Sequence, residues 1–223
     1  MSKLVWKELQ PDGAPTRLTE ACADMDWVKA LHLARSRPPG IFIHPTALRT
    51  IHDHVSGSRI EVGGLLLGEV FEWPNCHLDY PFASWVQAAI PARQLSDSPV
   101  FLEMDASVWS EARVSHPQMK ILGWFHSHPD LGVFFSGTDR HTQRHFFHLP
   151  HQIGLVIDPF RQQTACYAGA DSMEVPGHLI EVLSDRDGRS PTSPLPWTNA
   201  DLGMPAEFEP RCPPDRQTPP QPQ

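Results

Sequence analysis

Apolar residues gather into short runs along the middle of the chain, and these runs predict strands. EVGGLLLGEVF (61–71) is almost continuously apolar, whereas CHLDYPFASWVQAAI (76–90) partly alternates between apolar and polar positions. The predicted strands are 41–43, 61–71, 76–90, 120–128, 151–158 and 162–169. Together they predict one central sheet.

Between these strands, apolar residues recur at helical spacing. Pro45 suits the first turn of a helix and Gly57 its end, so HPTALRTIHDHVSG predicts a helix over about residues 45–57. ASVWSEARV (106–114) and DRHTQRHFFHLP (139–150) predict two more. Helices mixed with apolar strands indicate an α/β or α+β domain, with helices flanking the sheet.

The two ends of the chain differ from this middle part. The first 38 residues are polar and mixed, with one predicted helix at DMDWVKALHLAR (24–35). After about residue 184 the chain is crowded with proline and poor in aliphatic residues, so it cannot bury enough apolar surface to offset its ordering entropy. We therefore expect an N-terminal extension at 1–38, a folded domain at 39–184 and a disordered tail at 185–223.

Composition excludes several classes of protein. The net charge is −8 and no dense run of lysine and arginine occurs, so the electrostatic footprint of a nucleic-acid binder is missing. No signal-peptide core is present, and no stretch approaches the ~18 apolar residues of a membrane span. The four cysteines are far apart and form no CxxC pair, which argues against a disulfide framework or a cysteine zinc site. We expect a cytoplasmic protein that contacts neither nucleic acid nor membrane.

Histidine is frequent, with 13 in 223 residues, so an isolated pair carries little information. By composition alone an HxH pair should arise about 0.75 times. His52 and His54 form such a pair, but side chains two apart on a helix point about 200° apart, so we interpret them as helix surface. His141, His145 and His148 lie along one side of the next predicted helix; without a nearby helical glutamate, we interpret them as surface or packing residues.

His126 and His128 are different because they end a predicted strand, where positions i and i+2 share a face. Adding Pro129, Ser136 and Asp139 lowers the chance expectation to roughly 4 in 10,000. Ser136 can also cap the following helix, with Asp139 as the acid of a capping box, which would turn Asp139 back toward the histidines. Two nitrogens and one oxygen, with water in the fourth place, make an open zinc site of the catalytic kind; Fe²⁺ and Mn²⁺ accept the same ligands.

These residues resemble the JAMM motif of zinc metalloproteases, E…H[ST]HPx6SxxD, also called MPN+ or JAB. The matching positions are Glu61, His126, Ser127, His128, Pro129, Ser136 and Asp139. The similarity extends over about residues 41–170, through LGWFHSHP and IGLVIDP. It implies a cytidine-deaminase-like α/β fold with a curved mixed sheet flanked by helices, although the HxE and PCxxC signatures of deaminases are absent.

The resemblance also implies the role of each residue in a zinc-dependent isopeptidase. Zinc held by His126, His128 and Asp139 would lower the pKa of its water to about 7. Glu61 would act first as general base and then as general acid, its alternative being a solvated glutamate at a strand end. Ser136 would donate a hydrogen bond to the developing oxyanion.

Members of this family cleave bonds after the C-terminal glycine of ubiquitin or ubiquitin-like proteins, so the expected partners are a ubiquitin-like protein and its conjugates. The loop at 93–103 matches the first insertion of the family, which pairs with the extended tail of the substrate. Phe134 and Phe135 border the same site, where they either shape it or pack the loop. Compact bacterial relatives occur beside E1-like and E2-like enzymes, some in antiviral systems, so those enzymes are further expected partners.

Two other functions fit the same residues. The chain could be a non-catalytic binding module that recruits ubiquitin-like conjugates through its groove. It could also be a metallopeptidase that acts on a small sulfur-carrier-like protein. Glu61→Ala distinguishes the first alternative because a binding module would keep its biological output, and exchanging the carrier protein distinguishes the second.

Overall fold

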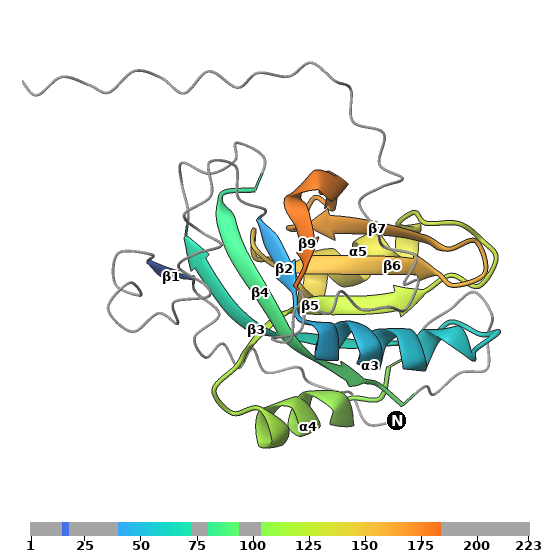
Figure 1. Ribbon diagram of the computed structural model, residues 1–223, viewed down its shortest axis with the longest axis horizontal. Coiled ribbons are helices and arrows are strands. Elements are labelled where there is room, and N and C mark those ends of the chain that lie inside the picture. The colour runs from blue at the N-terminus through green and yellow to red at the C-terminus, as the bar shows by residue number, and fades with distance from the viewer. Residues whose placement is uncertain (1–14, 18–39, 73–79, 94–103, 184–223) are drawn as a thin grey trace, which may run out of the picture.

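The computed structural model describes residues 15–17, 40–72, 80–93 and 104–183. Among these residues, nine strands form one mixed sheet in the order β8-β7-β6-β5-β3-β4-β2-β9, with β1 beside β3 (Figure 1). Their bounds are β1 Thr16–Arg17, β2 Ile41–Ile43, β3 Gly63–Glu72, β4 Phe82–Pro91, β5 Lys120–Ser127, β6 Ile153–Asp158, β7 Gln163–Ala168, β8 Met173–Glu174 and β9 Ile180–Val182. The predicted mixed and curved sheet is confirmed.

Both parallel and antiparallel pairs build this sheet. β3 and β4 form a long antiparallel pair that curves across the molecule (Figure 1). β5 pairs antiparallel with β3 and parallel with β6, which makes it an interior strand. β2 pairs parallel with both β4 and β9.

The helices among the described residues are α3 (Pro45–Ser56), α4 (Ser107–Ser115) and α5 (Gly137–Phe146), with a 3₁₀ turn at Gly177–Leu179. α3 begins at Pro45, as predicted, and the His44 side chain caps it by accepting a hydrogen bond from the Thr46 N–H. Gly57 ends the helix, also as predicted.

The helices pack on opposite faces of the sheet (Figure 1). On one face, Leu48 and Ile51 of α3 join a buried cluster with Leu66 and Phe125. On the other face, α4 and the segments around α5 cover a second buried cluster that includes Trp124. The face that α5 covers is the one that carries the candidate site.

A bulge in β5 decides which side chains reach that face. Leu66 pairs with Gly123 and Leu67 with Ile121, so Leu122 is an extra residue without a partner in this ladder. Gly123 has a φ of 148°, and a Cβ added there would collide with the Ile153 carbonyl oxygen, so the bulge requires glycine.

Several sequence predictions need correction. α5 ends at Phe146, so His148 lies beyond it and does not continue the row of His141 and His145. Of the strand predicted at 76–90, residues 76–79 lie outside the described residues, and β4 begins at Phe82, after Tyr80 and Pro81. His54 is not simply helix surface, because its ring packs edge-on against Phe125 and its Nε2 is buried.

Only a helix was predicted for the N-terminal segment, but this segment also contains a strand: β1 pairs in parallel with Phe71 and Glu72 of β3. The helix predicted at 24–35, most of the predicted insertion loop and the proline-rich tail lie outside the described residues, and the domain boundaries stay a prediction. No helix in the described part of the chain is long and apolar enough to cross a membrane.

Candidate metal centre

His126 lies in the interior strand β5 and is completely buried. It pairs with Gly63 of β3 and with Val156 of β6, so neighbours on both sides fix its backbone. Its ring stacks on Trp124, with centroids 4.4 Å apart and an interplanar angle of 8°. The strand and the stacking together leave the imidazole little freedom to turn.

Trp124 is itself anchored by a helix. Its Nε1 donates a hydrogen bond to Oε1 of Gln143 at 2.8 Å. The Gln143 amide donates in turn to the carbonyl oxygens of Phe147 at 2.8 Å and Gln152 at 3.1 Å. All polar atoms of the buried Gln143 side chain are therefore bonded, so α5 and β5 are held together beneath the candidate site.

His128 follows the end of β5, and its N–H donates to the carbonyl oxygen of Ile157 at 2.8 Å. Its Nε2 lies 3.2 Å from Nε2 of His126, so the two imidazoles converge as the strand period predicts. The exposed ring of Phe134 packs edge-on against His128, with centroids 5.0 Å apart. Phe135 is buried, and its ring packs against those of His126 and Tyr167, with centroids 5.8 Å and 4.2 Å apart. Both phenylalanines therefore border the site, Phe134 on its exposed side and Phe135 within the core.

Asp139 reaches the histidines from the first turn of α5. Ser136 caps this helix: its Oγ accepts from the Asp139 N–H at 3.2 Å, while Asp139 Oδ2 accepts from the Ser136 N–H at 2.7 Å. The predicted capping box is thus confirmed. The same carboxylate places Oδ1 3.3 Å from His126 Nε2 and Oδ2 3.5 Å from His128 Nε2.

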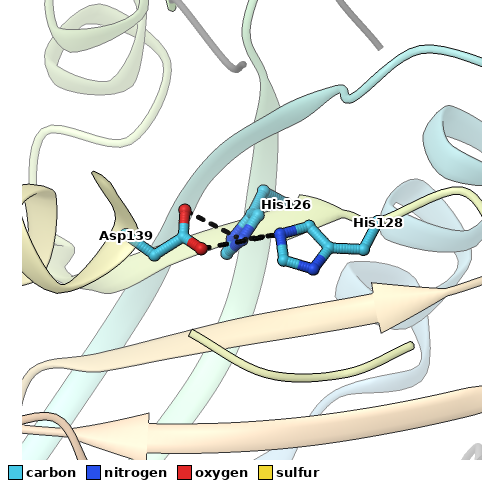
Figure 2. Close-up of side chains that lie close together, drawn as sticks. All are labelled: His126, His128 and Asp139. Carbon is cyan, nitrogen blue, oxygen red and sulfur yellow. Dashed lines mark hydrogen bonds and ion pairs between the residues drawn. The ribbon is translucent and has the colours of Figure 1, made fainter. Parts of the chain in front are cut away.

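The three predicted ligands therefore come together, as Figure 2 shows, with their side chains pointing toward one another. One ligand atom from each of His126, His128 and Asp139 lies within 4.8 Å of the others, and all three residues are buried. Two imidazole nitrogens and one carboxylate oxygen are ligands that suit a divalent transition metal. Because only three side chains contribute ligands, one coordination position of a four-coordinate metal would stay open.

Glu61 lies just before β3 and is only 5% exposed, so the alternative of a solvated glutamate is wrong. Its Oε1 is 3.6 Å from Nε2 of His128. Burial raises the pKa of Glu61 to about 7; the charge of His128 opposes this shift and that of Asp139 adds to it. A carboxyl group with a pKa near neutrality can both accept and release a proton at neutral pH.

Charge and burial set the protonation of the three ligands. Burial lowers the pKa of His126, which favours its neutral form. Burial also acts to lower the pKa of His128, but the hydrogen bond and charge of Asp139 outweigh it and raise that pKa. Desolvation would raise the pKa of Asp139, yet hydrogen bonds from both histidines hold it well below its usual range. Asp139 is therefore ionised, the form in which a carboxylate binds metal.

Sequence reasoning did not identify all the residues that hold this site. Ser127, between the two histidines, contacts a different segment: its Oγ accepts from the Val62 N–H at 3.1 Å, next to Glu61. Gln143 was missed, although its position four residues after Asp139 put it on the same helix face.

Similarity to known proteins agrees with this geometry. Residues 39–150 match the sequence model of the family described as JAB1/Mov34/MPN/PAD-1 ubiquitin protease. The chain is 24% identical over 162 residues to 26S proteasome non-ATPase regulatory subunit 14 of Dictyostelium discoideum, covering 72% of this chain and 49% of that protein. It is 36% identical over 130 residues to the histone deubiquitinase MYSM1 of Branchiostoma floridae, covering 55% of this chain and 15% of that protein.

The chain thus spans about half the length of the first of these relatives and less of the second. Among solved structures, a JAB1/MPN domain protein from Archaeoglobus fulgidus aligns with a TM-score of 0.40 at 18% identity, covering 65% of this chain and 98% of that one. A protein from Desulfitobacterium hafniense aligns with a TM-score of 0.49 at 22% identity, covering 65% and 94%. With half of its length matched by the family model, this chain belongs to the JAB1/Mov34/MPN/PAD-1 ubiquitin protease family.

Proposed function

We propose that this chain is a zinc-dependent isopeptidase that releases a ubiquitin-like modifier from lysine side chains of its conjugates. One observation carries the proposal: the buried carboxylate of Glu61 lies 3.6 Å from Nε2 of His128, beside a three-ligand cluster. A metal site with a purely structural role would not need a titratable acid beside its ligands, whereas a hydrolytic site needs a group that transfers protons.

The metal-binding residues in this proposal are His126, His128 and Asp139. Two nitrogens and one oxygen suit zinc, and a zinc ion bound there supplies Lewis acidity that polarises a carbonyl group and acidifies a water molecule at neutral pH. The protein supplies a buried cluster in which these three side chains are already gathered.

Glu61 carries the proton in the reaction. Its carboxylate takes a proton from the attacking water as the C–O bond forms, and then delivers it to the lysine amine as the C–N bond breaks. A pKa of about 7 suits both transfers because neither protonation state is strongly favoured near neutral pH.

Ser136 is the candidate donor to the carbonyl oxygen. Its Oγ accepts from the Asp139 N–H, which leaves the hydroxyl proton free of that bond. Directed toward the substrate, this proton would stabilise the charge that develops on the carbonyl oxygen.

The substrate class rests on the relatives, one of which is named as a deubiquitinase that acts on a histone. The conjugate is accordingly expected to end in a ubiquitin-like tail joined to lysine. Neighbouring genes for E1-like, E2-like and ubiquitin-like proteins would support a conjugation pathway, including an antiviral one, and their absence would favour a sulfur-carrier-like substrate.

The direct test uses a panel of modifier–lysine conjugates with the metal-free and the zinc-loaded protein. Zinc should restore cleavage, and Glu61→Gln should lower kcat by about 10²–10⁴-fold without weakening zinc binding. Glu72→Gln, the same change at an exposed position of β3, is the matched control. Cleavage that persists after metal removal would refute the metal role. Conjugate binding with no cleavage of any panel member would favour the binding-module alternative.

A further inference from the structure

A second buried carboxylate, Asp158, lies near the candidate site at the end of β6. Asp158 is fully buried, and its side chain is bonded to the backbone of two neighbouring turns. Oδ2 accepts from the Gly132 N–H at 2.7 Å. Oδ1 accepts from the N–H groups of Asp130 at 3.2 Å, Phe160 at 3.0 Å and Arg161 at 3.1 Å. Four N–H donors satisfy a charge that would otherwise be costly to bury.

The segment that Asp158 binds is conformationally unusual. Asp130 has a φ of 61° and Gly132 a φ of 85°, both in the left-handed region. Glycine adopts a positive φ without strain, but Asp130 does not, so the hydrogen bonds from both N–H groups to Asp158 help to hold the turn in this shape. Arg161 braces the exposed side: its Nε donates to Oδ1 of Asp130 at 3.0 Å and its Nη2 to the Asp130 carbonyl oxygen at 2.8 Å.

Through Gly132, this turn contacts His128, one of the three candidate metal ligands. Nδ1 of His128 lies 3.3 Å from the Gly132 carbonyl oxygen, a contact in which only a protonated Nδ1 can donate. A metal would replace the Nε2 proton that His128 shares with Asp139, and a proton on Nδ1 then leaves the Nε2 lone pair for that metal. The Gly132 carbonyl therefore selects both the tautomer and the direction of the His128 ring.

His126 is held in a different way. Its Nδ1 is buried and has no hydrogen-bond partner among the described residues, while its ring stacks on Trp124. Of the two imidazoles, only His128 thus depends on a hydrogen bond from its second nitrogen to the described part of the chain.

From these contacts we infer that Asp158 is a positioning residue: through Gly132 it fixes the tautomer and orientation in which His128 presents Nε2 to a metal. Asp158 neither binds the metal nor touches substrate. This inference rests on the proposed function, because it assigns His128 as a ligand.

Asp158→Asn tests the inference with minimal change in shape. Oδ1 of the asparagine can still accept three N–H groups, while its NH₂ group faces the Gly132 N–H and cannot accept from it. The zinc and Co²⁺ affinities, measured by competition with a chromophoric chelator, should fall about 10–100-fold, the range for lost support of a metal-binding histidine. The ligand-field spectrum of the Co²⁺ protein should change as the His128 ring moves.

Asp171→Asn is the matched control. It makes the same chemical change on an exposed side chain, in the turn that joins β7 to β8. Zinc affinity should stay within about twofold of the parent protein. Equal affinity and an equal Co²⁺ spectrum in Asp158→Asn and the parent would overturn the inference, as would an equal loss in both variants.

A measurement on the metal-free parent protein makes the test independent of that variant's folding. Nitrogen-15 NMR of the histidine rings at pH 8 should show a proton on Nδ1 of His128, and an Nδ1 without a proton would overturn the inference. Gly132→Ala, which strains the positive φ without touching Asp158, should weaken zinc binding in the same way. Unchanged zinc affinity in Gly132→Ala also counts against the inference.

A parent protein that binds no zinc refutes the proposed function instead. The NMR result for His128 Nδ1 then still decides whether the Gly132 carbonyl fixes the imidazole ring.

Discussion

The indole ring of Trp124 and the imidazole of His126 lie almost parallel, at an interplanar angle of 8° and a centroid separation of 4.4 Å. Trp124 also donates its Nε1 proton to Gln143 of α5. This tryptophan therefore links β5, which carries His126 and ends just before His128, to the helix that carries Asp139.

Trp124→Phe should lower both stability and metal affinity. Phenylalanine cannot donate to Gln143, whose buried Oε1 would be left without that hydrogen bond, at a cost of about 1–3 kcal/mol. Urea unfolding measures this cost, and a chelator competition measures zinc affinity. Trp109→Phe is the control, because Trp109 packs on Phe147 with centroids 5.6 Å apart and is only partly buried. Equal zinc affinities for the two variants would contradict the linking role of Trp124.

Ser136 combines a structural role with a proposed catalytic one, and two substitutions separate them. Ser136→Ala removes the acceptor for the Asp139 N–H, so the free energy of unfolding should fall by about 1 kcal/mol. Loss of the proposed oxyanion donor should lower kcat by about 10²–10³-fold with KM little changed. Ser136→Thr keeps a hydroxyl group and should retain most of both properties. Full activity in Ser136→Ala would rule out the oxyanion role. A loss of stability in the same variant would still support the capping role.

Metal binding should stabilise the fold through the three candidate ligands. At a free zinc concentration about 100 times the Kd, the folded state gains about 2.7 kcal/mol, which thermal unfolding detects as a higher midpoint. Asp139→Asn should abolish this gain. His141→Gln should keep it, because His141 is exposed on α5 and its ring stacks on His145, away from the three ligands. If His141→Gln removes the gain and Asp139→Asn does not, zinc binds the surface histidines instead.

Acid should destabilise the protein in part through His151. This side chain is buried, its Nε2 has no hydrogen-bond partner among the described residues, and burial together with the charge of Lys120 lowers its pKa to about 4. Between about pH 4 and 6.5 the unfolded state binds the proton and the folded state does not, so stability falls as the pH falls through this window. The His151 contribution is complete above about pH 6.5 and amounts to up to about 3 kcal/mol.

His151→Gln should flatten this dependence, because glutamine does not titrate. The free energy of unfolding is measured at pH values from about 4 to 7 for the parent, His151→Gln and His148→Gln. The last variant makes the same change at an exposed histidine and should keep the parent slope. An unchanged slope in His151→Gln would assign the acid sensitivity to other groups.

Local sequence signals predicted the parts of the fold that depend on local geometry. Pro45 and Gly57 mark the limits of α3 because proline favours a first helical turn and glycine a helix end. Ser136 and Asp139 predicted a capping box that lies within one helical turn. The convergence of His126 and His128 follows from the two-residue period of a strand.

Features that depend on distant partners could not be predicted in this way. The bulge at Gly123 depends on pairing with β3, and glycine in an apolar run does not indicate which residue is extra. Glu61 approaches His128 because β3 and β5 are neighbours, and only the family resemblance connected these residues in advance. β1 is two residues long, too short for any periodic pattern.

The interior position of β5 determines which part of the candidate site unfolds locally first. Backbone amides of β5 are bonded between β3 and β6, so they should exchange with deuterium only when most of the sheet opens. Asp139, in contrast, lies in the first turn of a helix whose neighbouring residues are exposed, and helix ends fray easily. Brief unwinding of that turn would withdraw the carboxylate while both imidazoles stay in place, which gives a bound ion an exit route that does not require unfolding of the sheet.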